Sequence, residues 1–257
     1  MYILNILACA IGSNYERFLI PFYLFALLHN TNTHVELVVK DKDAFLQRYK
    51  NELDAVISIV GSHFVLRNFQ KPFNKHRYNT YRFFEIPTIE AEYTYILDID
   101  IMILESVLEI YRDNWLNDMV YSNVLRYKNS SRLTGVHMVK TKEYYTEQYK
   151  ELINKYYNHN NNENDEVILG IMCKVCHGMP LPTYRFRPVL GIHFSPNRSK
   201  NSAVAALTYR EYYNKFMIIK DRYPHLFEFH IFKQLYNSLK TQFNIRNTPD
   251  DYNLRIQ

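Results

Sequence analysis

The chain has 257 residues, about the largest size that one hydrophobic core supports, which favours a single α/β domain with a small appendage over two independent domains. Its 31 Lys and Arg against 26 Asp and Glu give a net charge of +5 that is not gathered in one block, which argues against a dedicated nucleic-acid-binding protein. The 3 cysteines are too few for a disulfide framework and suit the reducing cytoplasm, and no apolar run reaches the roughly 20 residues that a membrane span needs.

The beginning of the chain alternates between strand-like and helix-like patterns. Residues 3–9 and 35–39 are short apolar runs typical of buried strands, and residues 55–60 are interpreted as a third strand. A helix is expected over residues 15–29. This alternation predicts an open, mostly parallel sheet with helices on its faces. Because ligands of such sheets bind beyond the carboxyl ends of the strands, the loop 10–15 is a candidate binding edge.

The middle of the chain carries a second strand-and-helix series. Residues 79–86 are predicted to be helical up to Pro87, and residues 93–97 form a compact apolar strand. The later elements are predicted as a strand, two helices and two basic, aromatic-rich helices, in chain order: residues 135–140, 141–157, 165–176, 208–222 and 224–241.

Two carboxylates, Asp98 and Asp100, interrupt the otherwise apolar residues 96–104. Burying an unpaired charge costs on the order of several kcal/mol, so both side chains need partners. If the strand ends at Asp98, a turn brings the two carboxylates to one side of the sheet edge, where they suit Mg²⁺ or Mn²⁺ and leave sites for phosphate oxygens. The residues alone leave two interpretations open: a metal site, or aspartates that are solvated or bound to arginine.

Around these carboxylates the chain resembles the glycosyltransferases of family eight, the group of glycogenin and the bacterial lipopolysaccharide galactosyl- and glucosyltransferases. In that family a Tyr-x-Arg-like helix ending in Ile-Pro precedes an apolar strand and an Asp-x-Asp, which is similar to residues 80–87 followed by residues 95–100. The family's Asn-x-Gly-Val strand resembles residues 132–139, and its Asp-Gln helix start resembles residues 164–166. The resemblance covers roughly residues 3–200.

A later segment, residues 191–198, is similar to the family's His-Phe-x-Gly-x-x-Lys, in which the histidine is the third metal ligand and the lysine holds the diphosphate. The resemblance gives these roles to His193 and Arg198. The segment departs from the family pattern at Ser195 and Pro196, where a glycine is expected nearby, and arginine differs from lysine in donor geometry.

The resemblance implies a complete set of site residues. The implied metal ligands are Asp98, Asp100 and His193. The implied catalytic residues are Arg82, Asp165 and Glu166, with Arg82 neutralising the diphosphate or orienting Asp98. The residues implied to bind the donor nucleotide are Ala10, Ile11, Gly12, Tyr15, Arg82, Asp98, Ile99, Asp100 and Arg198. Tyr15 is expected to stack on the base.

The resemblance also implies the fold and the reaction. We expect one GT-A domain with a Rossmann-like nucleotide-binding half (residues 1–104), a donor-sugar and acceptor half (105–200) and a helical carboxyl-terminal extension (201–257). The expected enzyme uses Mn²⁺ or Mg²⁺ and moves a sugar from a nucleotide donor, a UDP-sugar, to a glycan or lipid-linked glycan in surface polysaccharide synthesis, with retention at the anomeric carbon. The alternatives are a nucleotidyltransferase and a non-catalytic nucleotide-sugar-binding protein.

The expected location is the cytoplasm, with peripheral membrane contact left open. The two carboxyl-terminal helices alternate basic and aromatic residues, a pattern that can rest on anionic lipid headgroups. Acidic residues Asp221 and Glu228 interrupt the charge, and apolar residues at helical spacing usually face the protein's own core. The sequence therefore favours packing over lipid contact.

Overall fold

This computed structural model describes residues 2–73, 76–112, 119–125, 131–159, 163–179, 190–194 and 206–246. Within these residues, six strands form one sheet in the order β3-β2-β1-β4-β7-β6. Their bounds are β1 Tyr2–Ala10, β2 Thr33–Val39, β3 Phe64–Asn68, β4 Ala91–Ile96, β6 Tyr121–Ser122 and β7 His137–Lys140. The strands β1 to β4 are parallel, whereas β7 is antiparallel to β4 and to β6. The predicted open, mostly parallel sheet is confirmed.

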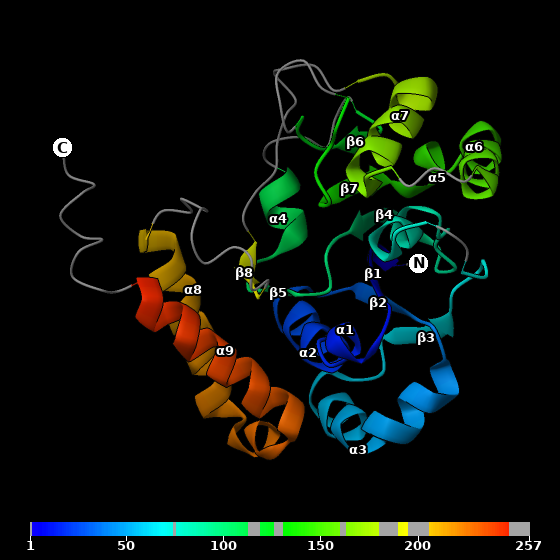
Figure 1. Cartoon of the computed structure of the whole chain (residues 1–257). Helices are drawn as coiled ribbons and strands as arrows, with labels where there is room; N and C mark the ends of the chain where they lie inside the picture. The colour runs from blue at the N-terminus through cyan, green and yellow to red at the C-terminus, as the bar shows by residue number, and fades with distance from the viewer. Residues whose placement is uncertain are drawn as a thin grey trace, which may run out of the picture.

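Helices cover both faces of this sheet (Figure 1). One face carries α1 Ser13–Glu16, α2 Leu19–His29 and α3 Lys42–Val60, and the other carries α5 Thr141–Tyr144, α6 Glu147–Asn158 and α7 Asp165–His177. Along β1, Leu4, Ile6 and Ala8 belong to the hydrophobic cluster of α2 and α3, and Leu7 belongs to the cluster of α6 and α7. Both faces of the central strand are therefore buried, as the run of apolar residues predicts.

The helix predicted over residues 15–29 is divided into α1 and α2. Pro21 explains the division, because proline has no N–H to donate and is accepted only in the first turn of a helix. With Pro21 in its first turn, α2 begins at Leu19. The helix predicted over residues 141–157 is also divided, because Thr146 accepts a hydrogen bond from the Tyr149 N–H and starts α6 afresh.

The strand predicted at residues 55–60 is wrong, because these residues form the last turns of α3. Leu53, Val56 and Val60 recur at positions i, i+3 and i+7, so the run of β-branched residues presents one apolar helix face to the core. Gly61 ends the helix with φ 78°, a conformation that glycine adopts most readily. The third parallel strand is β3, which follows Gly61.

Four short elements of the described residues lie outside the main sheet: η1, β5, α4 and β8. The helix predicted at residues 79–86 is a 3₁₀ helix, η1 Tyr78–Phe83. The apolar run after Asp100 forms β5 Ile101–Ile103, which pairs antiparallel with β8 Gly191–His193 in a separate two-stranded sheet. The helix α4, Val107–Arg112, follows β5.

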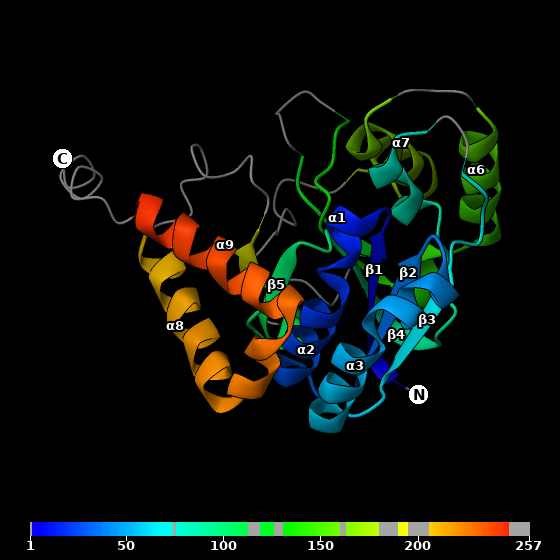
Figure 2. The ribbon, with the colours of Figure 1, turned by 60° about the horizontal axis from the view of Figure 1, so that its bottom comes forward.

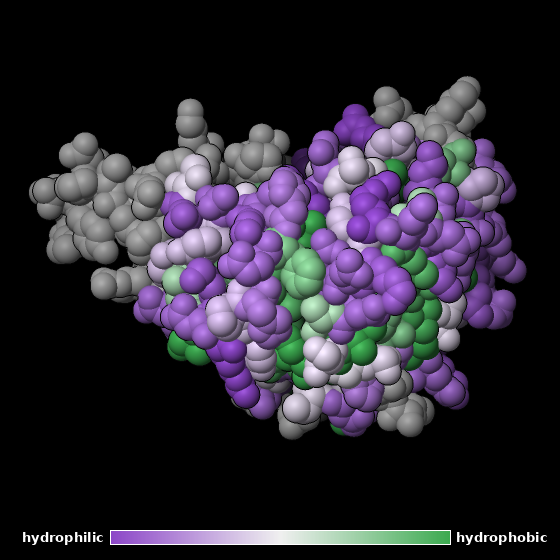
Figure 3. Space-filling view, turned by 90° about the horizontal axis from the view of Figure 1, so that it is seen from below, coloured by the Kyte–Doolittle hydropathy of each residue, from purple (hydrophilic) through white to green (hydrophobic). Residues whose placement is uncertain are grey.

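The carboxyl-terminal part forms a helical hairpin beside α2 (Figures 1 and 2). Its elements are α8 Ala206–Arg222, η4 Pro224–Glu228 and α9 His230–Arg246. Phe216 stacks on Phe25 of α2 with ring centroids 5.1 Å apart, and Lys215 forms an ion pair with Glu105. Seen from below, the surface is mainly hydrophilic, with hydrophobic side chains visible in its middle (Figure 3). None of the described helices is both long and apolar enough to span a bilayer.

The buried His137 makes the stability of the sheet sensitive to acid. Burial, with a smaller contribution from His177, lowers the pKa of His137 to about 3. Because the pKa is about 6.5 in the unfolded chain, stability from the neutral imidazole is complete above that pH and is lost as pH falls from 6.5 toward 3. We expect His137→Asn to reduce the pH dependence of the unfolding free energy by about 1.4 kcal/mol per pH unit. Urea denaturation between about pH 6.5 and 5 measures this difference.

The matched control is His225→Asn, the same exchange at an exposed position on the carboxyl-terminal hairpin. A His137→Asn protein with the wild-type pH dependence would contradict the assignment.

Candidate active site

The carboxylate pair lies where β4 ends. The chain turns after Ile96, and the Ile101 N–H donates to the carbonyl of Asp98 at 3.2 Å, which closes the turn before β5. Asp98 is partly exposed and Asp100 is buried, and both line one pocket at the carboxyl end of β4. The turn thus brings both carboxylates to the same side of the sheet edge.

The small β5–β8 sheet adds His193 to this edge. Its register places His193 opposite the residue that follows Asp100, and the Phe194 N–H donates to the Asp100 carbonyl at 2.8 Å. His193 Nε2 consequently lies 3.0 Å from Asp100 Oδ1. The strands approach closely because Gly191 has no Cβ, which would lie 1.8 Å from the carbonyl oxygen of Met102.

The three side chains fit a divalent cation. Ligand atoms of Asp98, Asp100 and His193 lie within 4.8 Å of one another. His193 Nδ1 is buried and has no hydrogen-bond partner among the described residues, so the imidazole has an unsatisfied nitrogen at this position. Two carboxylates with one imidazole are a donor set suited to Mn²⁺, and the oxygens alone suit Mg²⁺.

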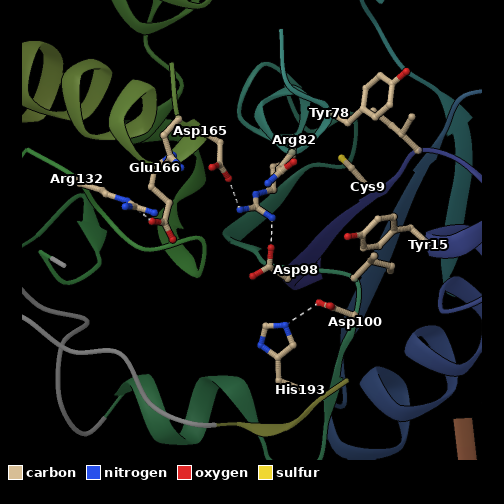
Figure 4. Close-up of a pocket in the computed structure, with 14 residues that line it drawn as sticks. Cys9, Tyr15, Tyr78, Arg82, Asp98, Asp100, Arg132, Asp165, Glu166 and His193 are labelled. Carbon is tan, nitrogen blue, oxygen red and sulfur yellow. Dashed lines mark hydrogen bonds and ion pairs between the residues drawn. The ribbon is translucent and has the colours of Figure 1, made fainter. Parts of the chain in front are cut away.

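Arg82, from η1, connects the carboxylates of two separate elements. It donates to Asp98 and, through Nη2, to Asp165 Oδ2 at 2.9 Å (Figure 4). Burial acts to lower the pKa of Arg82, but the negative charges of Asp98 and Asp165 together outweigh this effect. The net pKa shift is upward, so the guanidinium stays protonated. Gly135 leaves room for this side chain, since a Cβ there would lie 2.5 Å from Arg82 Nη2.

The amino end of α7 forms the opposite wall. Asn164 caps the helix by accepting from the Glu166 N–H at 3.0 Å. Arg132 Nε donates to Glu166 Oε2 at 2.7 Å, and the Leu133 N–H donates to the Glu166 carbonyl at 3.1 Å. Burial raises the pKa of Asp165, and the Arg82 charge opposes that shift. Each carboxylate on this wall therefore has its own arginine.

The carboxyl end of β1 forms the remaining side of the pocket. Cys9 and Ile11 line it, and Tyr15 stands at its edge with 52% of its surface exposed. Gly12, at φ 84°, turns the chain out of β1, and its carbonyl accepts the Tyr15 N–H at 3.0 Å. The predicted binding loop therefore lies at the pocket.

The structure brings most of the predicted site residues together. The predicted residues that line the pocket are Ile11, Tyr15, Arg82, Asp98, Ile99, Asp100, Asp165, Glu166 and His193. Ala10 is buried at the end of β1 and Gly12 starts the next turn, and neither lines the pocket. Arg198 lies outside the described residues.

Sequence reasoning missed five lining residues: Cys9, Tyr78, Asn79, Arg132 and Asn164. Arg132 and Asn164 carried a signal, because both lie in segments that resemble family motifs. Tyr78 carried none, as one of 23 tyrosines in the chain.

The chain is similar in structure to several solved glycosyltransferases. The chain is similar to galactosyltransferase LgtC in complex with donor and acceptor sugar analogues, with TM-score 0.52, 13% identity, and 82% of this chain and 94% of that chain covered. It is similar to glycosyltransferase GlyE of Streptococcus pneumoniae TIGR4, with TM-score 0.50, 16% identity, and 69% and 44% covered. It is also similar to the bifunctional glycosyltransferase WbbM, with TM-score 0.50, 14% identity, and 98% and 51% covered.

The chain has the GT-A glycosyltransferase fold. The resemblance to family eight is thereby confirmed at the level of architecture, since LgtC is a galactosyltransferase of that family. No protein-family model matches the chain, and no curated protein does. The chain spans 44% of the GlyE chain and about half of the WbbM chain, and identities this low establish a shared fold.

The space at Gly135 provides a test of the Arg82 position. We expect Gly135→Ala to displace the guanidinium from Asp98 and to lower the unfolding free energy, because the new Cβ would lie 2.5 Å from Arg82 Nη2. Urea denaturation of Gly135→Ala, Arg82→Ala and the double variant measures the coupling between the two positions. The alanine at 135 should be less destabilising when Arg82 is absent, and equal effects in both backgrounds would contradict the assigned contact.

Proposed function

We propose that this protein is a metal-dependent glycosyltransferase that moves a sugar from a nucleotide donor, a UDP-sugar, to a glycan or lipid-linked glycan acceptor. The observation that carries the proposal is the cluster of Asp98, Asp100 and His193 at the carboxyl end of β4 in a GT-A fold. LgtC, solved with donor and acceptor sugar analogues, supports a nucleotide sugar and a glycan as the two substrates.

The charge of the pocket supports a bound cation. Its described lining holds four carboxylates, from Asp98, Asp100, Asp165 and Glu166, against the guanidinium groups of Arg82 and Arg132. An excess of carboxylate would repel the diphosphate of a nucleotide sugar. A divalent ion on the aspartate pair removes that excess and attracts the diphosphate, so the proposed metal also explains how an acidic pocket accepts an anionic donor.

The residues around the cluster have separate roles in the proposed reaction. When bound, a divalent cation acts as a Lewis acid that stabilises the negative charge growing on the departing diphosphate. Asp98, Asp100 and His193 hold the cation, and Arg82 orients Asp98 and adds positive charge beside the phosphates. We assign the base and ribose to the side with Tyr15 and Ile11.

The opposite wall is proposed to face the sugar. Asp165 and Glu166 line the pocket from the start of α7, and their ion pairs with Arg82 and Arg132 fix the carboxylates in place. Carboxylate oxygens accept hydrogen bonds from sugar hydroxyl groups, which supports donor-sugar or acceptor contact here. We extend the proposal to retention of the anomeric configuration, surface polysaccharide synthesis and a cytoplasmic location, with Arg198 as a further diphosphate ligand.

The carboxyl-terminal hairpin gives little support to lipid contact. Phe216, Phe227 and Phe232 are buried against the core, and Lys220 and Lys240 lie over the Tyr236 ring at 5.0 and 4.5 Å. These aromatic residues of the hairpin thus have partners within the protein.

We retain the division into a nucleotide-binding half, a sugar half and a helical extension as part of the proposal.

Removal of the metal or of one carboxylate tests the proposed function. We expect UDP binding, measured by isothermal titration calorimetry, to require Mn²⁺ or Mg²⁺, and Asp100→Asn to weaken it by at least about tenfold because an amide is a neutral ligand. The same variant should lose transfer from a UDP-sugar while its circular dichroism stays native. Asp54→Asn, an exposed aspartate on α3, is the control. Full turnover in excess chelator would refute the proposal.

The third ligand has its own test. We expect His193→Ala to lower Mn²⁺ affinity by about tenfold or more, because two carboxylates then hold the ion without the imidazole. Titration followed by the electron paramagnetic resonance of free Mn²⁺ measures this directly, without turnover. His159→Ala, an exposed histidine, is the control. Unchanged affinity at limiting Mn²⁺ would make His193 a structural residue.

A further inference from the structure

Two exposed tyrosines stand at the same pocket. Among the described residues, the large hydrophobic side chains that are mainly exposed are Tyr15, Tyr78, Val175 and Ile218. Tyr15 and Tyr78, at 52% and 64% exposed, both line the pocket that holds the carboxylate cluster. Exposed aromatic surface gathered at a pocket is typical of a binding site for a planar group.

The ring of Tyr78 is held in place although it is exposed. Phe73 contacts it in a T-shaped arrangement with ring centroids 6.2 Å apart. Phe73 in turn packs on Tyr81 at 4.8 Å and on Phe69 at 5.1 Å, and Tyr81 is fully buried. One part of the Tyr78 ring thus rests on the partly buried Phe73, which is itself anchored on the buried Tyr81, and the larger part of the ring is left for a ligand.

The position of Tyr78 relates it to the base rather than to the sugar. Tyr78 begins η1, the helix that carries Arg82 four residues later. At a rise of about 2 Å per residue in a 3₁₀ helix, the two residues are about 8 Å apart along the axis. In Figure 4, Tyr78 lies with Cys9 and Tyr15 on the side away from Asp165 and Glu166. The base of a nucleotide whose phosphates lie at Arg82 can therefore reach Tyr78.

We propose that Tyr78 is a second aromatic contact for the base of the donor nucleotide, in addition to Tyr15; this inference rests on the proposed function. Each base presents a flat π-face, so two tyrosines from different segments bind it whatever its hydrogen-bonding edge. The neighbouring Asn79, which also lines the pocket, offers an amide to that edge. Nucleotide affinity then depends on the base as well as on the diphosphate and metal.

The test compares ligands with and without a base on the full chain. Titration calorimetry in Mn²⁺ uses UDP, GDP, ADP, CDP and inorganic diphosphate as probes. We expect Tyr78→Ala to lower the affinity for the preferred nucleoside diphosphate about tenfold and to leave the affinity for inorganic diphosphate unchanged. Tyr78→Phe should retain affinity, because the aromatic face is kept. Ile218→Ala, an exposed apolar residue on the carboxyl-terminal hairpin, is the control and should bind like the wild type.

A leucine at the same position separates stacking from packing. Tyr78→Leu keeps an apolar side chain against Phe73 but has no aromatic face, so we expect it to lose affinity like Tyr78→Ala. Wild-type nucleotide affinity in Tyr78→Leu or Tyr78→Ala would overturn the role of Tyr78 and leave the proposed function standing. Failure of the wild type to bind any of the nucleoside diphosphates in Mn²⁺ would overturn the proposed function itself. Non-additive losses in a Tyr15→Ala and Tyr78→Ala cycle would support a shared base.

Discussion

Arg82 forms the interaction on which the pocket depends. Its guanidinium donates to Asp98 at the end of β4 and to Asp165 at the start of α7, 83 residues further along the chain than Arg82. The desolvation cost of this buried guanidinium is offset by its hydrogen-bonded ion pairs, so moving either carboxylate away would leave part of the charge uncompensated. The proposed metal-binding edge and the opposite wall are thereby held at a fixed separation. Gly135 takes part by leaving the space that the guanidinium fills.

A second buried network holds the segment that carries Arg82. Glu36 and Glu85 are fully buried, and Arg67 forms ion pairs with both. Glu36 also accepts from Asn5 and from Thr88, so β1, β2, β3 and the chain after η1 meet at one point. Burial raises the pKa of Glu85 and Arg67 opposes that shift. Because Glu85 follows Arg82 by three residues, this network limits how far η1 can shift.

The third proposed ligand depends on the carboxyl-terminal hairpin. Phe194 follows His193 directly, and its ring lies between Phe18 and Phe216, with centroids 6.4 Å from each. Phe216 belongs to α8, in the part of the chain that resembles no family motif. The hairpin therefore packs behind β8 and supports the ligand edge. Buried aromatic contacts of this kind account for the core-facing pattern of apolar residues in the hairpin better than a lipid surface does.

The sequence by itself determined the α/β class, the parallel strands and the position of Asp98 and Asp100 at the end of a strand, because alternating apolar runs and two charges in an apolar segment are local signals. The interpretation of residues 55–60 as a strand was wrong, because the packing partners of β-branched residues decide whether they form a strand or a helix. The family resemblance had already grouped His193 with Asp100, whereas only the tertiary structure joined Arg82 to Asp165 and Tyr78 to the pocket. Those contacts depend on strand pairing and on the packing of distant helices, and no short stretch of sequence records either of them.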